Sequence, residues 1–301
     1  MSEPAPSSEQ VLLRATASRT VASDWSLVLA SADIAHRIVE GGGAFSLVVG
    51  AADANAAAET LAAFDVESVP AVMPPAPDLG PSALGVLSGA ALLAMFIVKG
   101  PRDVPAPAAW FDVGSASAEA IVHGQWWRAI TALTLHADVM HLAGNVIACL
   151  IFVSAVGRWL GPGLGAALIV GCASVANGLT ALWHRREFVS VGASTATFVA
   201  IGLVAGLQLV RRWRYDVRRR YAWLPLGAAL GLFAMLGVGE HADVGAHLFG
   251  LSVGAAAGTA VAGTGLRAPA RLGQALLIAL ASAVLVGAWL LAFRASGRAL
   301  P

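Results

Sequence analysis

Ser194 and His247 are residue types that can perform acyl transfer together. A serine hydroxyl is a weak nucleophile until a neighbouring imidazole removes its proton. The oxyanion formed when the hydroxyl attacks a carbonyl then needs preorganised hydrogen-bond donors. His141 and Asn145, four residues apart and so on one face of a helix, are candidate donors beside the Ser194 backbone N–H. The four residues predict a site for acyl transfer.

We expect no carboxylate to orient His247, because no apolar segment carries one at a suitable depth. The prediction is therefore a Ser194–His247 dyad, with Asp243 capping the helix of His247. The alternative of a metal site built from His136, His141 and His247 lacks the H-E-x-x-H spacing that places two ligands on one helix face. We therefore predict no metal site from these histidines.

The composition indicates a membrane protein rather than a soluble one. Of the 301 residues, 57% are hydrophobic and 12% are charged, whereas soluble chains carry about 25% charged residues. The net charge of +1 gives no argument for a nucleic-acid partner. Cys149 and Cys172 lie in apolar runs, and we infer no disulfide from them.

Seven apolar runs approach the roughly 20 residues that a transmembrane helix needs. They are Ser82–Val98, His141–Val156, Leu164–Leu182, Val189–Val210, Tyr221–Val238, Val244–Ala262 and Ala275–Phe293. The second, fourth and sixth carry His141, Ser194 and His247 near their starts and would cross the bilayer in the same direction. The three side chains should therefore lie at similar depth in an all-α polytopic membrane protein.

Small residues predict how the fourth and sixth spans meet. Gly250, Gly254 and Gly258 follow His247 on one helix face, and Gly202 and Gly206 have matching spacing after Ser194. Such stripes allow helix backbones to approach closely. This contact would bring Ser194 within reach of His247.

Arginines set the expected topology. Six arginines between the fourth and fifth spans predict a cytoplasmic loop by the positive-inside rule: Arg211, Arg212, Arg214, Arg218, Arg219 and Arg220. The N-terminus is then cytoplasmic and the C-terminus lies outside, although Arg185 and Arg186 count against this orientation. Trp127 and Arg128 are predicted to anchor an outer loop at the membrane interface.

Residues 1–66 are less apolar and predict a small soluble α/β domain. We expect a helix capped by Ser23 through Ala32, a second capped by Asp53 through Ala63, and between them a hairpin of Ala35–Glu40 and Phe45–Val49 around three glycines. Prolines in residues 67–81 predict a stiff linker.

Three separate motifs resemble those of the rhomboid family of intramembrane serine proteases. They are Gly124-Gln125-Trp126-Trp127-Arg128 with Thr131, His136, His141-Leu142 and Asn145; Gly192-Ala193-Ser194 with Phe198 and Gly202; and Ala246-His247 with Gly250 and Gly254. Together they span about Trp110 to Gly258, in the order that is typical of the family.

The resemblance implies a six-helix core over residues 82–263, with a seventh transmembrane helix and tail in residues 264–301. It implies a serine endopeptidase of a bacterial-type cytoplasmic membrane that cleaves transmembrane segments of other membrane proteins near the outer face. It assigns His141 and Asn145 to an oxyanion hole and Phe198 to packing against His247, and it implies that the protein uses neither a metal nor a cofactor. It also implies an outer loop, Gly100–Leu135, lying partly in the membrane, and a mobile cap, Gly239–Asp243, over the site.

One residue departs from the family pattern: Thr195 follows the nucleophile where the family usually has glycine. If that position needed an unusual backbone conformation, a β-branched residue would loosen the oxyanion hole, whereas a helical conformation would tolerate it. Thr195 thus supports the alternative of a catalytically inactive relative that binds transmembrane helices. A proton-relaying transporter is a second alternative, but the sequence has no inverted repeats. The oligomeric state stays open.

Overall fold

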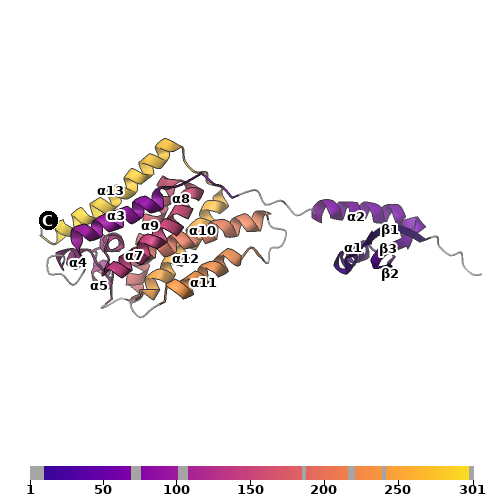
Figure 1. Ribbon diagram of the computed structural model, residues 1–301, viewed down its shortest axis with the longest axis horizontal. Helices are drawn as coiled ribbons and strands as arrows, with labels where there is room; N and C mark the ends of the chain where they lie inside the picture. The colour runs from indigo at the N-terminus through magenta and orange to yellow at the C-terminus, as the bar shows by residue number, and fades with distance from the viewer. Residues whose placement is uncertain are drawn as a thin grey trace, which may run out of the picture. The chain divides into compact units, whose positions relative to one another are not determined.

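The computed structural model describes residues 10–68, 76–100, 108–184, 188–215, 221–238 and 242–297. The chain divides into two compact units, Met1–Ala71 and Val72–Pro301 (Figure 1). The first contains a small sheet with two helices, and the second is a bundle of apolar helices.

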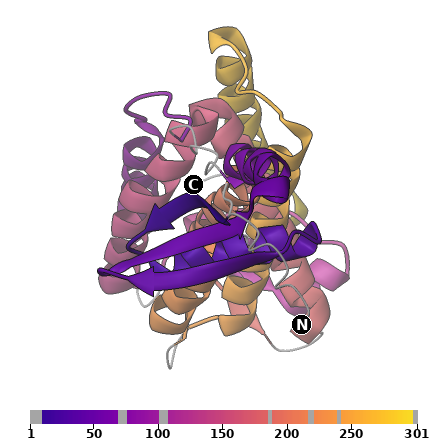
Figure 2. The same cartoon turned by 90° about the vertical axis from the view of Figure 1, so that its right-hand side faces the viewer.

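The N-terminal unit has the order β1 (Gln10–Thr16), α1 (Arg19–Ser31), β2 (His36–Gly41), β3 (Ala44–Gly50) and α2 (Ala54–Ser68). Its three antiparallel strands lie in the order β1-β3-β2 (Figure 2). The predicted hairpin is confirmed: Gly41 pairs with Ala44, and Gly42 and Gly43 form the turn with φ of +59° and +80°. A two-residue turn with positive φ at both positions strongly favours glycine.

Two expectations for this unit were wrong, and one strand was not predicted. Strand β1 was not predicted, because a register shift between Leu12 and Arg14 breaks the alternation that marks a strand. Ser18, not Ser23, caps α1: it has extended backbone and accepts a hydrogen bond from the N–H of Val21 at 3.4 Å. Asp53 belongs to a 3₁₀ turn (Ala51–Asp53) ahead of α2, which continues to Ser68.

The second unit contains five helices that are long and apolar enough to cross a membrane, within the described residues. They are α7 (Val139–Ala148) continued by η3 (Cys149–Val153) and α8 (Ser154–Leu160), then α9 (Pro162–His184), α10 (Ser194–Tyr215), α12 (Val244–Thr264) and α13 (Arg271–Ala295). Helices α3 (Leu84–Lys99) and α11 (Leu224–Leu236) are apolar but shorter. All of them lie roughly parallel (Figure 1), as a polytopic membrane protein requires.

The fourth and fifth apolar runs differ from their predicted bounds. Helix α10 begins at Ser194 rather than Val189, because Val189–Ser190 forms a strand, β5, paired with β4 (Ala116–Ser117). Gly192 follows with φ of +131°, a conformation outside the helical region. Helix α11 has 13 residues and ends at Leu236.

Helix α10 lies at the centre of the unit and packs most extensively on α12. A Cβ placed on Gly254 would lie 2.3 Å from the Val199 carbonyl oxygen, and one on Gly202 would lie 2.3 Å from that of Leu251. Side chains larger than hydrogen do not fit at these positions. The predicted backbone-to-backbone packing is confirmed.

The loop between α3 and α7 is folded into short helices: α4 (Ala108–Gly114), α5 (Ala118–Val122), α6 (Arg128–Thr131) and the 3₁₀ turn η2 (Ala132–Thr134). Arg128 anchors it from within, because its guanidinium donates to the carbonyls of Ser115 (3.0 Å) and Asp112 (2.8 Å) and to Gln125 Oε1 (2.6 Å). These bonds fix the loop beside the strand that leads to Ser194.

Helix α13 is attached to the rest of the unit at both ends. Near its start, the Gln274 amide accepts from the N–H groups of Gly163 (2.6 Å) and Leu164 (2.9 Å) and donates to the Leu160 carbonyl (2.9 Å). Near its end, the buried Lys99 ammonium lies 3.9 Å from the centroid of the Trp289 ring. Both contacts are between elements far apart in the sequence.

The end of the predicted linker is attached to the second unit. Asp78 forms an ion pair with Arg158, and the N–H of Leu79 donates to the Arg158 carbonyl at 2.9 Å. The Arg158 guanidinium and the Gly80 N–H lower the pKa of the Asp78 carboxyl.

Candidate active site

Ser194 is the first residue of α10, and the segment before it is held in place. The N–H of Gly192 donates to the Ala132 carbonyl (2.9 Å), and the N–H of Ala193 points to His136 Nε2 at 3.5 Å. The first N–H groups of a helix have no partner within it and carry the positive end of the helix dipole. Negative charge that develops beside the Ser194 N–H is therefore stabilised.

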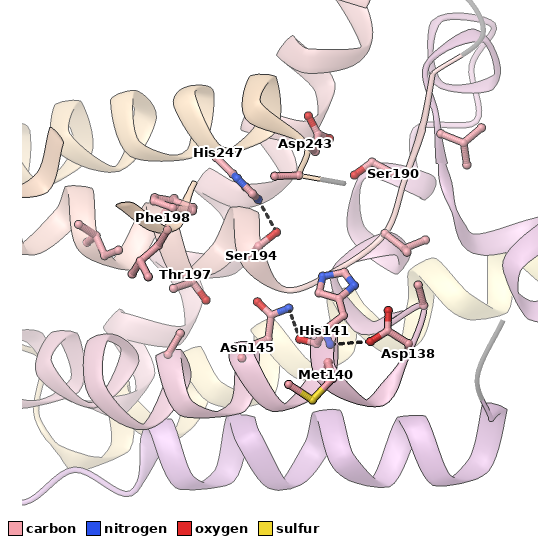
Figure 3. Close-up of a pocket in the computed structure, with 18 of the residues that line it drawn as sticks. Asp138, Met140, His141, Asn145, Ser190, Ser194, Thr197, Phe198, Asp243 and His247 are labelled. Atoms are coloured by element: carbon pink, nitrogen blue, oxygen red, sulfur yellow. Dashed lines mark hydrogen bonds between the residues drawn. The ribbon is translucent and has the colours of Figure 1, made fainter. Parts of the chain in front are cut away.

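His247 lies beside Ser194 although 53 positions separate them in the chain (Figure 3). Its Nε2 is 2.8 Å from Ser194 Oγ, and its Nδ1 is 2.9 Å from the Gly237 carbonyl oxygen. A carbonyl only accepts hydrogen bonds, so Nδ1 of the neutral imidazole carries the proton and Nε2 accepts from the serine hydroxyl. This tautomer is the one that can remove the Ser194 proton.

Two further side chains hold His247. Asp243 Oδ1 accepts from the Ala246 N–H at 2.8 Å, so the predicted cap of this helix is confirmed. The Phe198 ring, one turn after Ser194, packs on the imidazole with centroids 4.7 Å apart. The His247 imidazole is therefore fixed by its helix start, by a ring on α10 and by a carbonyl.

Gly237 was not identified from the sequence. It is the C-terminal cap of α11, and its contribution is a main-chain carbonyl, which any residue carries. The residue type still matters, because a Cβ at this position would lie 2.9 Å from Phe198 Cζ. A glycine ending an apolar run shortly before a histidine was the available signal.

His141 and Asn145 lie across the cavity on α7. Asp138 caps this helix by accepting from the His141 N–H at 2.8 Å, and Asn145 Nδ2 donates to the His141 carbonyl at 3.0 Å. One N–H of the Asn145 amide is thus used within the helix, and the other is left for a ligand. A Cβ on Gly192 would lie 2.6 Å from His141 Nε2, so the imidazole lies against the backbone just before Ser194.

These side chains line one cavity of about 780 Å³ (Figure 3). Its walls come from α7, α10, the end of α11, the start of α12 and the strand before Ser194; they include His141, Asn145, Ser194, Phe198, Leu236 and His247. The polar groups converge on Ser194 while the remaining walls are mostly apolar. The cavity can receive a peptide segment with apolar side chains. Residues 239–241 of the predicted cap lie outside the described residues.

His136 is buried directly behind the site. Its ring lies 5.2 Å from that of His141, and burial, with the nearby His141 and Lys99, lowers its pKa to about 3. The neutral ring positions the Ala193 N–H and does not face the cavity. Among the described residues, no group of three His, Cys, Asp or Glu is arranged to hold a metal ion.

Thr195 occupies an ordinary helical position. Within the described part of the chain, Asp33 is the residue other than glycine with a positive φ, so the Thr195 backbone is free of that strain. Its side chain is buried, and its Cγ2 would lie 3.4 Å from a Cβ on Gly250. The small residue on α12 therefore makes room for the β-branched residue on α10.

Comparison with known proteins gives one family. A model described as "Rhomboid domain" matches residues 123–264, which include Ser194 and His247. "Putative rhomboid protease YdcA" of Bacillus subtilis (strain 168) is 29% identical over 145 residues, 48% of this chain and 72% of the relative. "Rhomboid protease GluP" of the same organism is 32% identical over 99 residues (33% of the chain, 19% of the relative). "RHOMBOID-like protein 1" of Arabidopsis thaliana is 29% identical over 146 residues (47% and 36%). The chain thus matches less than two thirds of the length of the last two.

Proposed function

Because the chain is a multi-pass membrane protein that belongs to the rhomboid family, we propose that it is an intramembrane serine endopeptidase. Its substrates are transmembrane segments of other membrane proteins. The observation that carries the proposal is the 2.8 Å contact between Ser194 Oγ and His247 Nε2, with Nδ1 held by the Gly237 carbonyl. A rotationally fixed base at hydrogen-bond distance is what activates a serine nucleophile.

In the acylation step, Ser194 Oγ bonds to the carbonyl carbon of the scissile peptide while its proton moves to His247 Nε2. The electron pair of the broken C=O π bond becomes an oxyanion. The Ser194 N–H at the start of α10, the His141 ring and the free N–H of Asn145 are the donors for this charge. When the C–N bond breaks, the imidazolium returns its proton to the leaving amine.

In the deacylation step, a water molecule loses its proton to His247 Nε2 and attacks the acyl carbon. Collapse of the second oxyanion releases the carboxyl product, and Ser194 Oγ recovers the proton. The Gly237 carbonyl accepts from Nδ1 in both steps, so the ring keeps one orientation while its charge changes.

The orientation follows from the arginines after α10. We place that end of the bundle at the cytoplasmic face of a bacterial-type inner membrane, so the active site opens to the outer face. Residues 1–66 then form a cytoplasmic domain, joined by the linker of residues 67–81 to a core of residues 82–263 and a seventh helix in residues 264–301. Reporter fusions after residue 68 and after residue 297 should give opposite topology signals.

The test uses purified full-length chain in proteoliposomes with a panel of transmembrane reporter substrates. Wild type should cleave at least one reporter and react with a fluorophosphonate probe, whereas Ser194→Ala and His247→Ala should lose activity about 10⁴-fold or more. Ser252→Ala, a serine exposed on α12, is the matched control and should behave as wild type.

The same assay decides between the protease and the inactive relative. Absence of labelling in wild type, or equal labelling in Ser194→Ala, would refute the protease. The Thr195 backbone is helical, so the backbone strain on which the inactive alternative depended is absent at this position.

A further inference from the structure

A second groove lies between α10 and α11, on the side of the bundle away from the start of α10. Its volume is about 310 Å³. Ile201, Val204, Ala205, Gln208 and Arg212 line it from α10. Leu224, Pro225, Ala228, Ala229 and Leu232 line it from α11, with Phe152 from η3. Both helices contribute residues at helical spacing, so each presents one face to the groove.

The groove is apolar along its length and cationic at one end. Arg212 and Gln208 are its two polar residues, one turn apart near the end of α10. The Nε of Arg212 is buried and, among the described residues, has no hydrogen-bond partner. A buried guanidinium N–H without an acceptor is costly, which indicates that a ligand with an acceptor belongs there.

The first turn of α11 adds to the positive charge at this end. Leu224 and Pro225, its first two residues, line the groove, and no side chain caps the helix. The N-terminus of a helix carries partial positive charge and therefore favours anions; Pro225 has no N–H, so this effect comes from the helix dipole and the N–H of Leu224. An acceptor beside Arg212 would thus be negatively charged.

The cationic end lies at the depth of lipid headgroups. Arg212 follows Ser194 by 18 residues in one helix, a rise of about 27 Å, close to the roughly 30 Å thickness of the hydrocarbon core. Trp213 and Trp223 form an edge-to-face pair at the same end, with centroids 5.8 Å apart, and each is about half exposed. Tryptophans of this kind mark a membrane interface.

Leu224 is 57% exposed, so the groove is on the outer surface of the bundle, where lipid can enter it. We propose that this groove binds an anionic phospholipid, with an acyl chain between α10 and α11 and the phosphate on Arg212 and Gln208. Basic pockets between transmembrane helices on the cytoplasmic side are suited to such headgroups. The groove shares Ile201 with the cavity at Ser194, but its cationic end lies about 27 Å from Ser194 along α10, and lipid binding there does not depend on catalysis.

The experiment titrates the purified full-length chain in detergent with phosphatidylglycerol or phosphatidylcholine and counts bound lipid by native mass spectrometry. Wild type should retain one phosphatidylglycerol in preference to phosphatidylcholine. Arg212→Gln should weaken this binding about tenfold. Arg214→Gln is the matched control: it removes the same charge two residues away, where the side chain donates to the Gly263 carbonyl instead.

A second pair of variants tests the apolar part while keeping the charge. Ala228→Phe should fill the groove and abolish the retained lipid, whereas Leu230→Phe, on an exposed part of the same helix outside the groove, should not. The proposal is overturned if both lipids bind equally, if Arg212→Gln and Arg214→Gln lose equal affinity, or if Ala228→Phe retains the lipid. Because binding is measured without a substrate, its failure and that of the proposed protease are distinguishable.

Discussion

Gly254→Ala tests how the packing of two helices sets the distance between Ser194 and His247. Gly254 lies on α12 about two turns after His247, directly against the backbone of α10. An alanine Cβ would lie 2.3 Å from the Val199 carbonyl oxygen, whereas ordinary contact begins at 3.4 Å. Relieving the overlap (3.4 minus 2.3 Å) requires the helices to separate by about 1.1 Å.

A separation of that size would move His247 Nε2 from 2.8 Å to about 3.9 Å from Ser194 Oγ, beyond hydrogen-bond distance. A misplacement of about 1 Å at a reacting centre costs roughly 100-fold in rate. We therefore expect kcat for a transmembrane reporter to fall about 100-fold. KM should change little, since the cavity walls on α7 are not displaced.

Gly263→Ala is the matched control on the same helix, because a Cβ there has no atom within 4 Å. Alanine is favoured over glycine within a helix by about 0.5–1 kcal/mol, so this variant should keep wild-type activity and equal or higher thermal stability. Thermal unfolding of both variants separates misplacement from misfolding. A folded Gly254→Ala protein with wild-type kcat would refute the reasoning.

Three further predictions concern stability. Gln274→Met leaves the N–H groups of Gly163 and Leu164 and the Leu160 carbonyl without their partner at the α8–α9 junction. The free energy of unfolding in chemical denaturation should fall by about 2–4 kcal/mol. An unchanged denaturation midpoint would contradict the capping role. Lys99→Met and Trp289→Leu should be coupled by about 1–2 kcal/mol in a double-mutant cycle, because a desolvated ammonium lies over the indole; additive losses would exclude the interaction. The pKa of His136 is about 3 in the folded protein and about 6.5 in the unfolded chain. Between these two pH values the unfolded chain binds a proton at His136 and the folded protein does not, so the folded state loses stability as the pH falls. The stability that wild type has over His136→Gln should thus be full above pH 6.5 and decline as the pH falls, and a difference constant between pH 7 and 4 would show that the ring is not held neutral.

Pattern in the sequence predicted the parts of the site that depend on helix geometry. The shared direction of three spans and the glycines after Ser194 and His247 were sufficient to predict their proximity, since both follow from helical periodicity. The start of α10 was placed five residues early, because Val189 and its neighbours are as apolar as a span. Strand β1 was missed for a related reason: its register shift hides the alternation.

The group that orients the His247 imidazole could not be predicted from side-chain types, because it is a main-chain carbonyl. A carboxylate beside His247 would have to be buried among apolar helices, which is costly unless it is paired. The last carbonyls of a helix lack partners within it and are available without that cost. Gly237, the C-terminal cap of α11, supplies one to Nδ1 at 2.9 Å. The end of α11 therefore fixes the tautomer of the imidazole without a buried charge. In the proposed mechanism, the position of this short helix is part of the geometry on which proton transfer from Ser194 depends.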